Sequence, residues 1–192
     1  MKNLIKRFIR VIALIVVSPL WIFYTITPNR LKAGLFRTSA QFLSLFPGLL
    51  GSYLRLAFFR ITMNKCSPTG VIHFATLFSH ANTDINENVY IGPQCNIGQC
   101  SIGDDTLIAS GVHILSGKSQ HNFDSLDTPI QQQGGKYEKI SIGSDCWIGN
   151  GALVMANIGN HAIVAAGSVV INDVPENAIV AGNPAKIIKY RS

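Results

Sequence analysis

Residues 84–114 read DINENVYIGPQCNIGQCSIGDDTLIASGVHI, and this stretch decides the fold. An aliphatic residue returns at every sixth position, with a single five-residue step in the middle. A second ladder of the same kind occupies residues 142–170. The ladder residues are Ile85, Ile91, Ile97, Ile102, Ile108 and Ile114, followed by Ile142, Ile148, Val154, Ile158, Val164 and Val170.

A spacing of six fits neither a helix, which repeats about every 3.6 residues, nor a simple strand, which repeats at two. It indicates a short strand followed by a corner, repeated, with each aliphatic side chain in a shared core. Small or β-branched residues four positions further on suit the same core. Glycine directly follows half of the ladder residues, and we expect it to supply the backbone angles of the turns. One such coil cannot bury its core alone, so stacked coils stabilise one another.

The ladder is interrupted between Ile114 and Ile142. A polar excursion, residues 115–139, leaves the repeat there and contains His121 and Asp124. A loop of that length inside a compact repeat is either functional or disordered. A four-residue step from Val154 to Ile158 predicts one tight corner.

The charge of the chain is divided unevenly. Sixteen Lys and Arg against ten Asp and Glu give a net charge of +6. The first 60 residues hold nine of the basic residues and no acidic one, which leaves seven basic and ten acidic residues after them. Because the basic character is confined to one end, the protein does not resemble one that coats nucleic acid. A composition that is 47% hydrophobic also argues against a disordered chain.

The first 60 residues predict helices that associate with a membrane. Residues 11–26 are free of charge, but the run is short for a bilayer span and contains Pro19. Residues 31–59 place Leu and Phe among isolated basic residues and break at Pro47-Gly48, which predicts two short helices. A signal peptide is disfavoured because bulky residues such as Trp21 occupy the place of a cleavage site.

We therefore expect residues 1–60 to bind the cytoplasmic side of the inner (plasma) membrane, where positive charge and anionic lipid favour attachment. The alternative is a helical subdomain packed on the main domain. Whether residues 11–26 span the membrane or lie in its interface stays open. Residues 61–192 are expected to form the repeat domain, with the excursion 115–139 and a C-terminal tail.

Further motifs accompany the ladder: GKSQHNFD (117–124), CWIGNGA (146–152), AAGSVV (165–170), VP (174–175) and GNPAK (182–186). Together they resemble the hexapeptide-repeat acyltransferases, in particular the sugar and xenobiotic O-acetyltransferase branch. The resemblance covers about residues 70–190. It implies a mainly β fold, a left-handed parallel β-helix whose coils form a three-sided prism, and a homotrimer with active sites in the clefts between subunits.

The resemblance also implies the chemistry. The donor is acetyl-CoA, no metal is expected to take part, and the acceptor is a hydroxyl or an amine. A hydroxyl is a poor nucleophile until a base removes its proton, and histidine can do so near neutral pH. His121 matches the catalytic histidine of the family. Asp124, in the H-x-x-D pattern, is expected to orient the imidazole or to hydrogen-bond the acceptor.

For the donor, Trp147 and Asn150 match a segment that lines the pantetheine cleft in the family. Ala166 matches a position where a small side chain lets the cofactor approach the backbone. Lys186 and Lys189 match basic positions near the phosphates of the cofactor. This sequence departs from the family pattern at Ile171-Asn172, where a Thr-Lys pair is common, and in the shortened step after Val154.

These features favour an acyl-CoA-dependent O-acetyltransferase that acts on a sugar or lipid-linked glycan, as in polysaccharide or lipopolysaccharide biosynthesis. One alternative is transfer to a small soluble acceptor such as serine, an amino sugar or an antibiotic. Another is a catalytically idle, trimeric membrane scaffold. His113 is either a surface residue or a second catalytic one, and its spacing to His121 does not suggest a zinc site. The four cysteines show no disulfide or metal pattern, and Cys95 and Cys146 are expected to fill the core.

Overall fold

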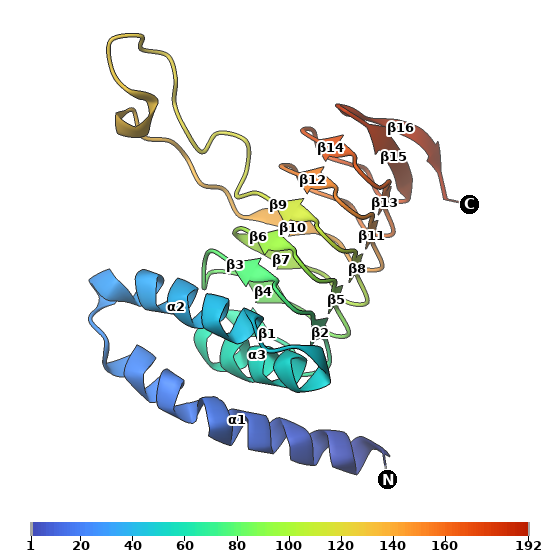
Figure 1. Ribbon diagram of the computed structural model, residues 1–192. Helices are drawn as coiled ribbons and strands as arrows, with labels where there is room; N and C mark the ends of the chain where they lie inside the picture. The colour runs from blue at the N-terminus through green and yellow to red at the C-terminus, as the bar shows by residue number, and fades with distance from the viewer. Residues whose placement is uncertain (1, 192) are drawn as a thin grey trace.

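The computed structural model describes residues 2–191, with side chains from residue 4 onward. Three helices lie at one end of a stack of parallel coils, as Figure 1 shows. The helices are α1 (Lys2–Ile26), α2 (Asn29–Ser44) and α3 (Gly48–Thr62). The rest is a parallel β-helix of three sheets, so the prediction of a mainly β fold built from hexapeptide repeats is confirmed.

Each sheet forms one face of a prism, and successive strands along the chain move from face to face. Face 1 holds β1 (Lys65–Cys66), β4 (Asp84–Ile85), β7 (Cys100–Ile102) and β10 (Ile140–Ile142). Face 2 holds β2 (Val71–Ile72), β5 (Tyr90–Ile91), β8 (Leu107–Ile108), β11 (Trp147–Ile148), β13 (Ile163–Val164) and β15 (Ala178–Gly182). Face 3 holds β3 (Leu77–Phe78), β6 (Asn96–Ile97), β9 (His113–Ile114), β12 (Leu153–Val154) and β14 (Val169–Val170). The last strand, β16 (Ala185–Tyr190), runs antiparallel to β15 at the edge of face 2.

The ladder residues form the core of this prism. Most of them are the last residue of a short strand, and each pairs in register with the ladder residue one coil away, as Ile91 does with Ile108. None of the twelve is more than 2% exposed. The small residues four positions on, including Cys95 and Cys146, are buried as well, so the predicted assignment of these cysteines to the core is confirmed.

The glycines that follow ladder residues have a different role from the one that the sequence suggests. Gly92 and Gly149 do not adopt a positive φ. A Cβ on Gly92 would lie 2.7 Å from the Ser110 nitrogen, and one on Gly149 would lie 2.5 Å from the Ala166 nitrogen. The expectation that these glycines supply turn angles is therefore wrong. They are needed because the backbone of the next coil passes too close for a side chain.

The left-handed backbone conformation occurs instead at the third residue after a ladder position. Glycine takes this place in some coils, with φ of 66° at Gly151 and 69° at Gly167. Elsewhere a non-glycine residue takes it, in most cases a residue type that tolerates positive φ, as at Asn88 (56°) and Asp145 (51°). Because corners of this type repeat along the stack, successive coils have the same shape.

Two of the three corners are regular and one is not. Every step from face 1 to face 2, and from face 2 to face 3, spans six residues. The step from face 3 back to face 1 spans seven residues after Phe78, five after Ile97, and four after Val154 and Val170. The excursion 115–139 leaves at the same place, between β9 and β10. We call this edge of the prism the variable corner.

The helices close the first end of the prism. Helices α2 and α3 contact the strands of the first coil, and α1 packs on α3 and α2 from the outside (Figure 1). Their apolar side chains continue the core of the coils, since the rings of Phe59 and Phe78 lie 4.7 Å apart between centroids. The predicted break at Pro47-Gly48 separates α2 from α3, whereas α1 continues through Pro19. The segment Leu4–Ile26 of α1, with a mean hydropathy of 2.1, is long and apolar enough to cross a membrane by length and composition.

Arg55 of α3 ties this helical end together. It is fully buried, and its Nε donates to the Ile72 carbonyl at 3.0 Å. Its Nη1 donates to the carbonyls of Leu43 at 3.0 Å and Phe46 at 2.8 Å, which lie at the C-terminal end of α2 and just beyond it. A cation at this place satisfies carbonyls that a helix end leaves without partners. Arg55 therefore belongs to the core, and the basic surface of residues 1–60 is made by the other cations.

Candidate active site

The excursion begins and ends at neighbouring coils of the variable corner. Its two limbs are joined by backbone hydrogen bonds: Glu138 donates to Ser116 at 2.9 Å, and Lys136 donates to Ser119 at 2.7 Å. Asn122 donates to Gly134 at 3.0 Å. Beyond these bonds the chain forms a single 3-10 turn, Ile130–Gln132. The excursion is therefore a paired arm that projects from the prism, as Figure 1 shows.

His121 lies in the outgoing limb of this arm, between two of the bonded pairs. The facing residue is Gly135, where a Cβ would lie 1.9 Å from the Gln120 carbonyl oxygen. Glycine at this place lets the two limbs meet directly behind His121. The imidazole is exposed, and Asp124 is exposed further along the arm. Among the described residues, no hydrogen bond joins His121 to Asp124, so the H-x-x-D pair is not assembled within one chain.

The residues predicted to bind the donor lie on another part of the prism. Trp147 is on face 2, in β11, and its side chain is 53% exposed. Asn150 and Ala166 lie on the corner between faces 2 and 3, in neighbouring coils, where Gly167 donates its backbone N–H to the Asn150 carbonyl at 2.8 Å. The structure therefore brings these three positions to one region of neighbouring coils.

That corner carries a bare strip of backbone. A Cβ added to Gly151 or Gly167 would meet no atom within 4 Å, so the space outside these glycines is open. Both have a positive φ and sit directly beside Asn150 and Ala166. We call residues 150–151 and 166–167 the glycine shelf. An extended ligand could lie on the shelf and reach backbone atoms that side chains would otherwise cover.

Lys186 and Lys189 are exposed on β16, at the last edge of face 2. Lys189 pairs with Ile179, which pairs with Ile163, which in turn pairs with Trp147. The row places a cation three strands from the indole, which is roughly 14 Å at the usual strand spacing. A donor that lay along this region could therefore meet an aromatic ring near one end and positive charge near the other.

The arm and the glycine shelf occupy different edges of one chain. The arm leaves from the variable corner between faces 3 and 1, whereas the shelf lies between faces 2 and 3 and Trp147 lies on face 2. In Figure 1 the arm projects to the side opposite the strands β11, β13 and β15. His121 and the predicted donor residues are thus not brought together within a single subunit.

Two cavities flank the base of the arm. One, of about 580 Å³, lies between the arm and the later coils and is lined by Lys118 and Lys139 together with Met155–Asn157 and Ile171–Asp173. The lining includes the two places where the sequence departs from the family pattern. The other cavity, of about 290 Å³, lies on the side of the earlier coils.

The smaller cavity collects residues that the sequence did not single out as a group. His113 projects from face 3, Gln120 and Tyr137 come from the arm, and His80 lies with its ring 5.9 Å from that of Tyr137. Burial, with a contribution from the charge of Arg37, holds the pKa of His80 below its usual value. His80 is therefore neutral at pH 7. Only the fold brings Tyr137 beside His80, and no spacing in the sequence indicates it.

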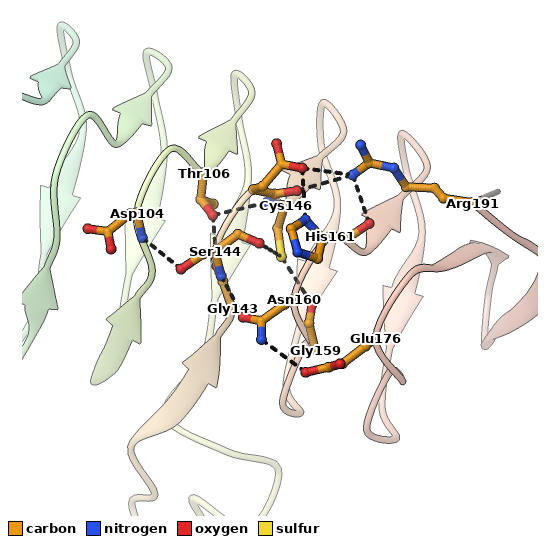
Figure 2. Close-up of polar contacts among 11 residues, drawn as sticks. Asp104, Thr106, Gly143, Ser144, Cys146, Gly159, Asn160, His161, Glu176 and Arg191 are labelled. Carbon is orange, nitrogen blue, oxygen red and sulfur yellow. Dashed lines mark hydrogen bonds and ion pairs between the residues drawn. The ribbon is translucent and has the colours of Figure 1, made fainter.

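A polar cluster, shown in Figure 2, occupies the corner between faces 1 and 2. His161 Nδ1 lies 2.9 Å from Asp145 Oδ2, and Arg191 Nη1 lies 3.3 Å from the same oxygen. Arg191 also donates to the His161 carbonyl at 2.9 Å. The hydrogen bond from His161, together with the charge of Arg191, lowers the pKa of Asp145. These contacts fasten Arg191 to two coils, on a corner away from the arm.

The cysteines are not candidates for catalysis. Burial raises the pKa of Cys66 and of Cys100 to about 12, and it also raises the pKa of Cys95 and Cys146. A thiol in this state carries almost no thiolate at neutral pH and is a poor nucleophile. Within residues 2–191 no three His, Cys, Asp or Glu side chains are grouped as metal ligands would be.

Residues 82–116 match the family model of the bacterial transferase hexapeptide (six repeats). The structure is similar to a maltose O-acetyltransferase from Clostridium difficile 630, with a TM-score of 0.69 and 22% identity over 83% of this chain and 88% of that one. It is also similar to a hexapeptide-repeat acetyltransferase from Vibrio cholerae, with a TM-score of 0.63 and 23% identity over 83% of this chain and 92% of the other.

A third solved structure is an N-acyltransferase from Bacillus cereus in complex with dTDP and 3-hydroxybutyryl-CoA. Its TM-score is 0.52, with 18% identity over 63% of this chain and 69% of that one. No curated protein matches the sequence significantly. At these identities the likenesses establish the fold, and the hexapeptide-repeat architecture predicted from the ladder is confirmed.

Proposed function

We propose that the protein is an acyl-CoA-dependent O-acetyltransferase that acts on a sugar or lipid-linked glycan at the cytoplasmic face of the inner membrane. The observation that carries the proposal is the paired arm that presents His121 from a hexapeptide β-helix. The similar structures include a maltose O-acetyltransferase and an N-acyltransferase bound to an acyl-CoA, which supports the same class of reaction.

His121 is the proposed general base. Its imidazole removes the proton from the acceptor hydroxyl as the oxygen attacks the thioester carbonyl. The same imidazole then returns the proton to the departing thiolate of coenzyme A, so that an ester and a thiol are formed and His121 ends neutral. The arm has no nucleophilic thiol, so we propose direct transfer between donor and acceptor.

The donor supplies the activated acetyl group, and the residues of the chain fit its shape and charge. The glycine shelf offers exposed backbone to an extended amide-containing chain. Trp147 offers an exposed ring nearby, and Lys186 and Lys189 offer positive charge for phosphates.

We further propose that the working unit is a homotrimer. Because His121 and the shelf lie on different edges of one chain, an arm from one subunit has to meet the shelf of a neighbour. Rotation about a threefold axis brings two different edges of identical prisms together in each of three equivalent clefts.

The proposal is tested by incubating the full chain with acetyl-CoA and a panel of mono- and oligosaccharides and glycolipid extracts. Release of free coenzyme A and a gain of one acetyl group in the acceptor, seen by mass spectrometry, are expected. Binding of coenzyme A without transfer to any hydroxyl compound would contradict the assigned reaction. Absence of coenzyme A binding would contradict the assignment to the acyl-CoA-dependent transferases.

A further inference from the structure

The outermost helix of the protein presents an apolar face to the outside. Its members recur about every three or four residues, singly or as adjacent pairs, with one gap between Val16 and Ile22, and this spacing places them on one side of a helix. All are between 43% and 72% exposed. We call this face the α1 stripe; it consists of Leu4, Ile5, Phe8, Val11, Ile12, Ile15, Val16, Ile22, Phe23 and Ile26.

The opposite face of α1 is already occupied. Ala13 and Val17 are 3% and 1% exposed, and Leu20 and Tyr24 pack partly into the same core. Helix α1 lies across the end of the prism, with α3 between it and the first coil (Figure 1). A bilayer span would require α1 to leave this contact and to surround both faces with lipid. The packed face therefore favours a helix that stays on the protein.

The charge around the α1 stripe indicates what covers it. The first 60 residues hold no acidic residue, and Lys6, Arg7 and Arg30 are exposed on α1 and α2. Arg10 and Arg60 line one shallow pocket between α1 and α3, and Arg10 Nε has no hydrogen-bond partner among the described residues. A second copy of the chain would bring like charges together at this face. An anionic lipid surface offers both the apolar layer and the negative charge.

We propose that α1 lies flat in the interface of an anionic leaflet, with the α1 stripe at the acyl boundary and its cations among the phosphates, and that it does not cross the bilayer. This inference rests on the membrane attachment proposed above and decides the orientation that the sequence leaves open. A flat α1 also orients the axis of the prism relative to the membrane, because the coils then stack away from the leaflet.

The orientation limits the acceptor. Packed helices lie about 8–10 Å apart and successive coils about 4.8 Å apart, so the base of the arm stands roughly 25–30 Å above the axis of α1. The arm projects sideways from the stack of coils (Figure 1). The reacting hydroxyl therefore belongs to a saccharide that extends well beyond the lipid headgroup, and a sugar directly linked to the lipid phosphate is too close to the surface.

Flotation with lipid vesicles tests the attachment. Wild-type protein is mixed with vesicles of phosphatidylcholine, with or without phosphatidylglycerol. We expect flotation only with the anionic vesicles and a decrease as salt is raised. Ile15→Glu puts a charge in the α1 stripe and is expected to weaken binding roughly tenfold or more. Ile188→Glu is the matched control, since the two isoleucines are 65% and 63% exposed, and it should float like the wild type.

Labelling from one side of sealed vesicles tests the orientation. Lys6→Cys places a thiol near the start of α1, and Asn29→Cys places one just beyond its end, at the first residue of α2. The wild type measures any reaction of the native thiols. After the protein is added outside, a membrane-impermeant maleimide should modify both new cysteines. Modification at one end alone would show a span and overturn the proposal.

Three other outcomes are informative. Equal binding of wild type and Ile15→Glu would overturn the role of the α1 stripe. A wild type that does not float, but forms an assembly that Ile15→Glu reduces in size, would assign the stripe to a second copy. Acetyl transfer to a soluble sugar should be unchanged in Ile15→Glu. A wild type that floats with anionic vesicles but transfers no acetyl group would contradict the proposed chemistry and leave the flat orientation of α1 standing.

Discussion

Lys139 Nζ lies 2.7 Å from Asp84 Oδ2, so the residue that ends the arm is tied to the second coil. The ammonium also donates to Asn82 Oδ1 at 3.1 Å, and Asn64 Nδ2 donates to Asp84 Oδ1 at 2.6 Å. Both side chains of the ion pair are largely shielded from solvent, at 27% and 20% exposure. The base of the arm that carries His121 is thereby fixed to the prism.

Replacing Lys139 by Met is expected to destabilise the protein by about 1 kcal/mol at pH 7. Burial raises the pKa of Asp84, but the hydrogen bonds from Lys139 and Asn64 outweigh it, and the net pKa lies below the usual value. The contribution is therefore present above the ordinary carboxyl pKa and is lost as the pH falls through the lowered one. Urea unfolding at a series of pH values from 7 down to 2 checks this, and the difference between wild type and variant should shrink as the pH falls. A difference that stays constant over the whole series would count against the ion pair as its source.

Arg55 offers a second test of stability. Arg55→Met removes the donors from four carbonyl groups at the helical end, and we expect a loss of about 3 kcal/mol in the free energy of unfolding. Burial lowers the pKa of Arg55 to about 10, so the side chain is still charged at pH 7. Arg60→Met, at an exposed position on the same helix, serves as the control and should change the free energy little. Equal effects of the two substitutions in chemical unfolding would refute the role of Arg55.

The two kinds of glycine in the corners should respond differently to the same substitution. Gly151→Ala places a side chain in open space at a φ of 66°, and a cost of about 1 kcal/mol is expected from the left-handed conformation. Gly149→Ala forces a Cβ to within 2.5 Å of the Ala166 nitrogen, and the expected cost is about 3 kcal/mol or more. Thermal unfolding of the two variants measures which substitution lowers the stability more. If Gly151→Ala is the more destabilising substitution, the close approach of the neighbouring backbone is not the reason that glycine is needed at position 149.

The sequence predicts the prism well because its core is local and periodic. A buried aliphatic residue that returns every six positions, such as Ile91, can be recognised in a single sequence. The interruption after Ile114 marks the two ends of the arm where the structure places them. The role of Gly92 differs from the expected one because a positive φ and a close approach of two backbones both select glycine, and a sequence does not show which of them applies. Only the packing of one coil on the next distinguishes them.

Other features depend on contacts between distant segments. Arg55 appears in the sequence as one more cation of a basic region. Its burial depends on carbonyls from α2, from the residues just after α2 and from β2, which the fold brings around its guanidinium. The placement of His121 and the glycine shelf on different edges also requires the fold, because strand order decides which face each residue joins. Of the two roles that the resemblance implies for Asp124, the orientation of the His121 imidazole would need a contact that is not formed within the described residues of one chain.

Mixed assemblies test whether the site is shared between subunits. His121→Ala removes the base, and Ala166→Trp covers the glycine shelf, so each variant alone should be inactive. When the two are co-expressed in equal amounts, random threefold assembly gives some clefts with an intact base and an intact shelf, and about a quarter of wild-type activity is expected. Activity that stays at the level of the separate variants would show that both groups must come from one chain.

His121 is the residue on which the proposed reaction depends most. Acetyl transfer to the identified acceptor is measured for wild type, for His121→Ala, and for His161→Asn, which alters an exposed histidine away from the arm and keeps a residue that tolerates positive φ. We predict that His121→Ala lowers turnover by roughly 100- to 10,000-fold while the Kd for coenzyme A stays the same, and that His161→Asn retains turnover. Undiminished turnover in folded His121→Ala, with donor binding intact, would contradict the central claim that this residue is the base.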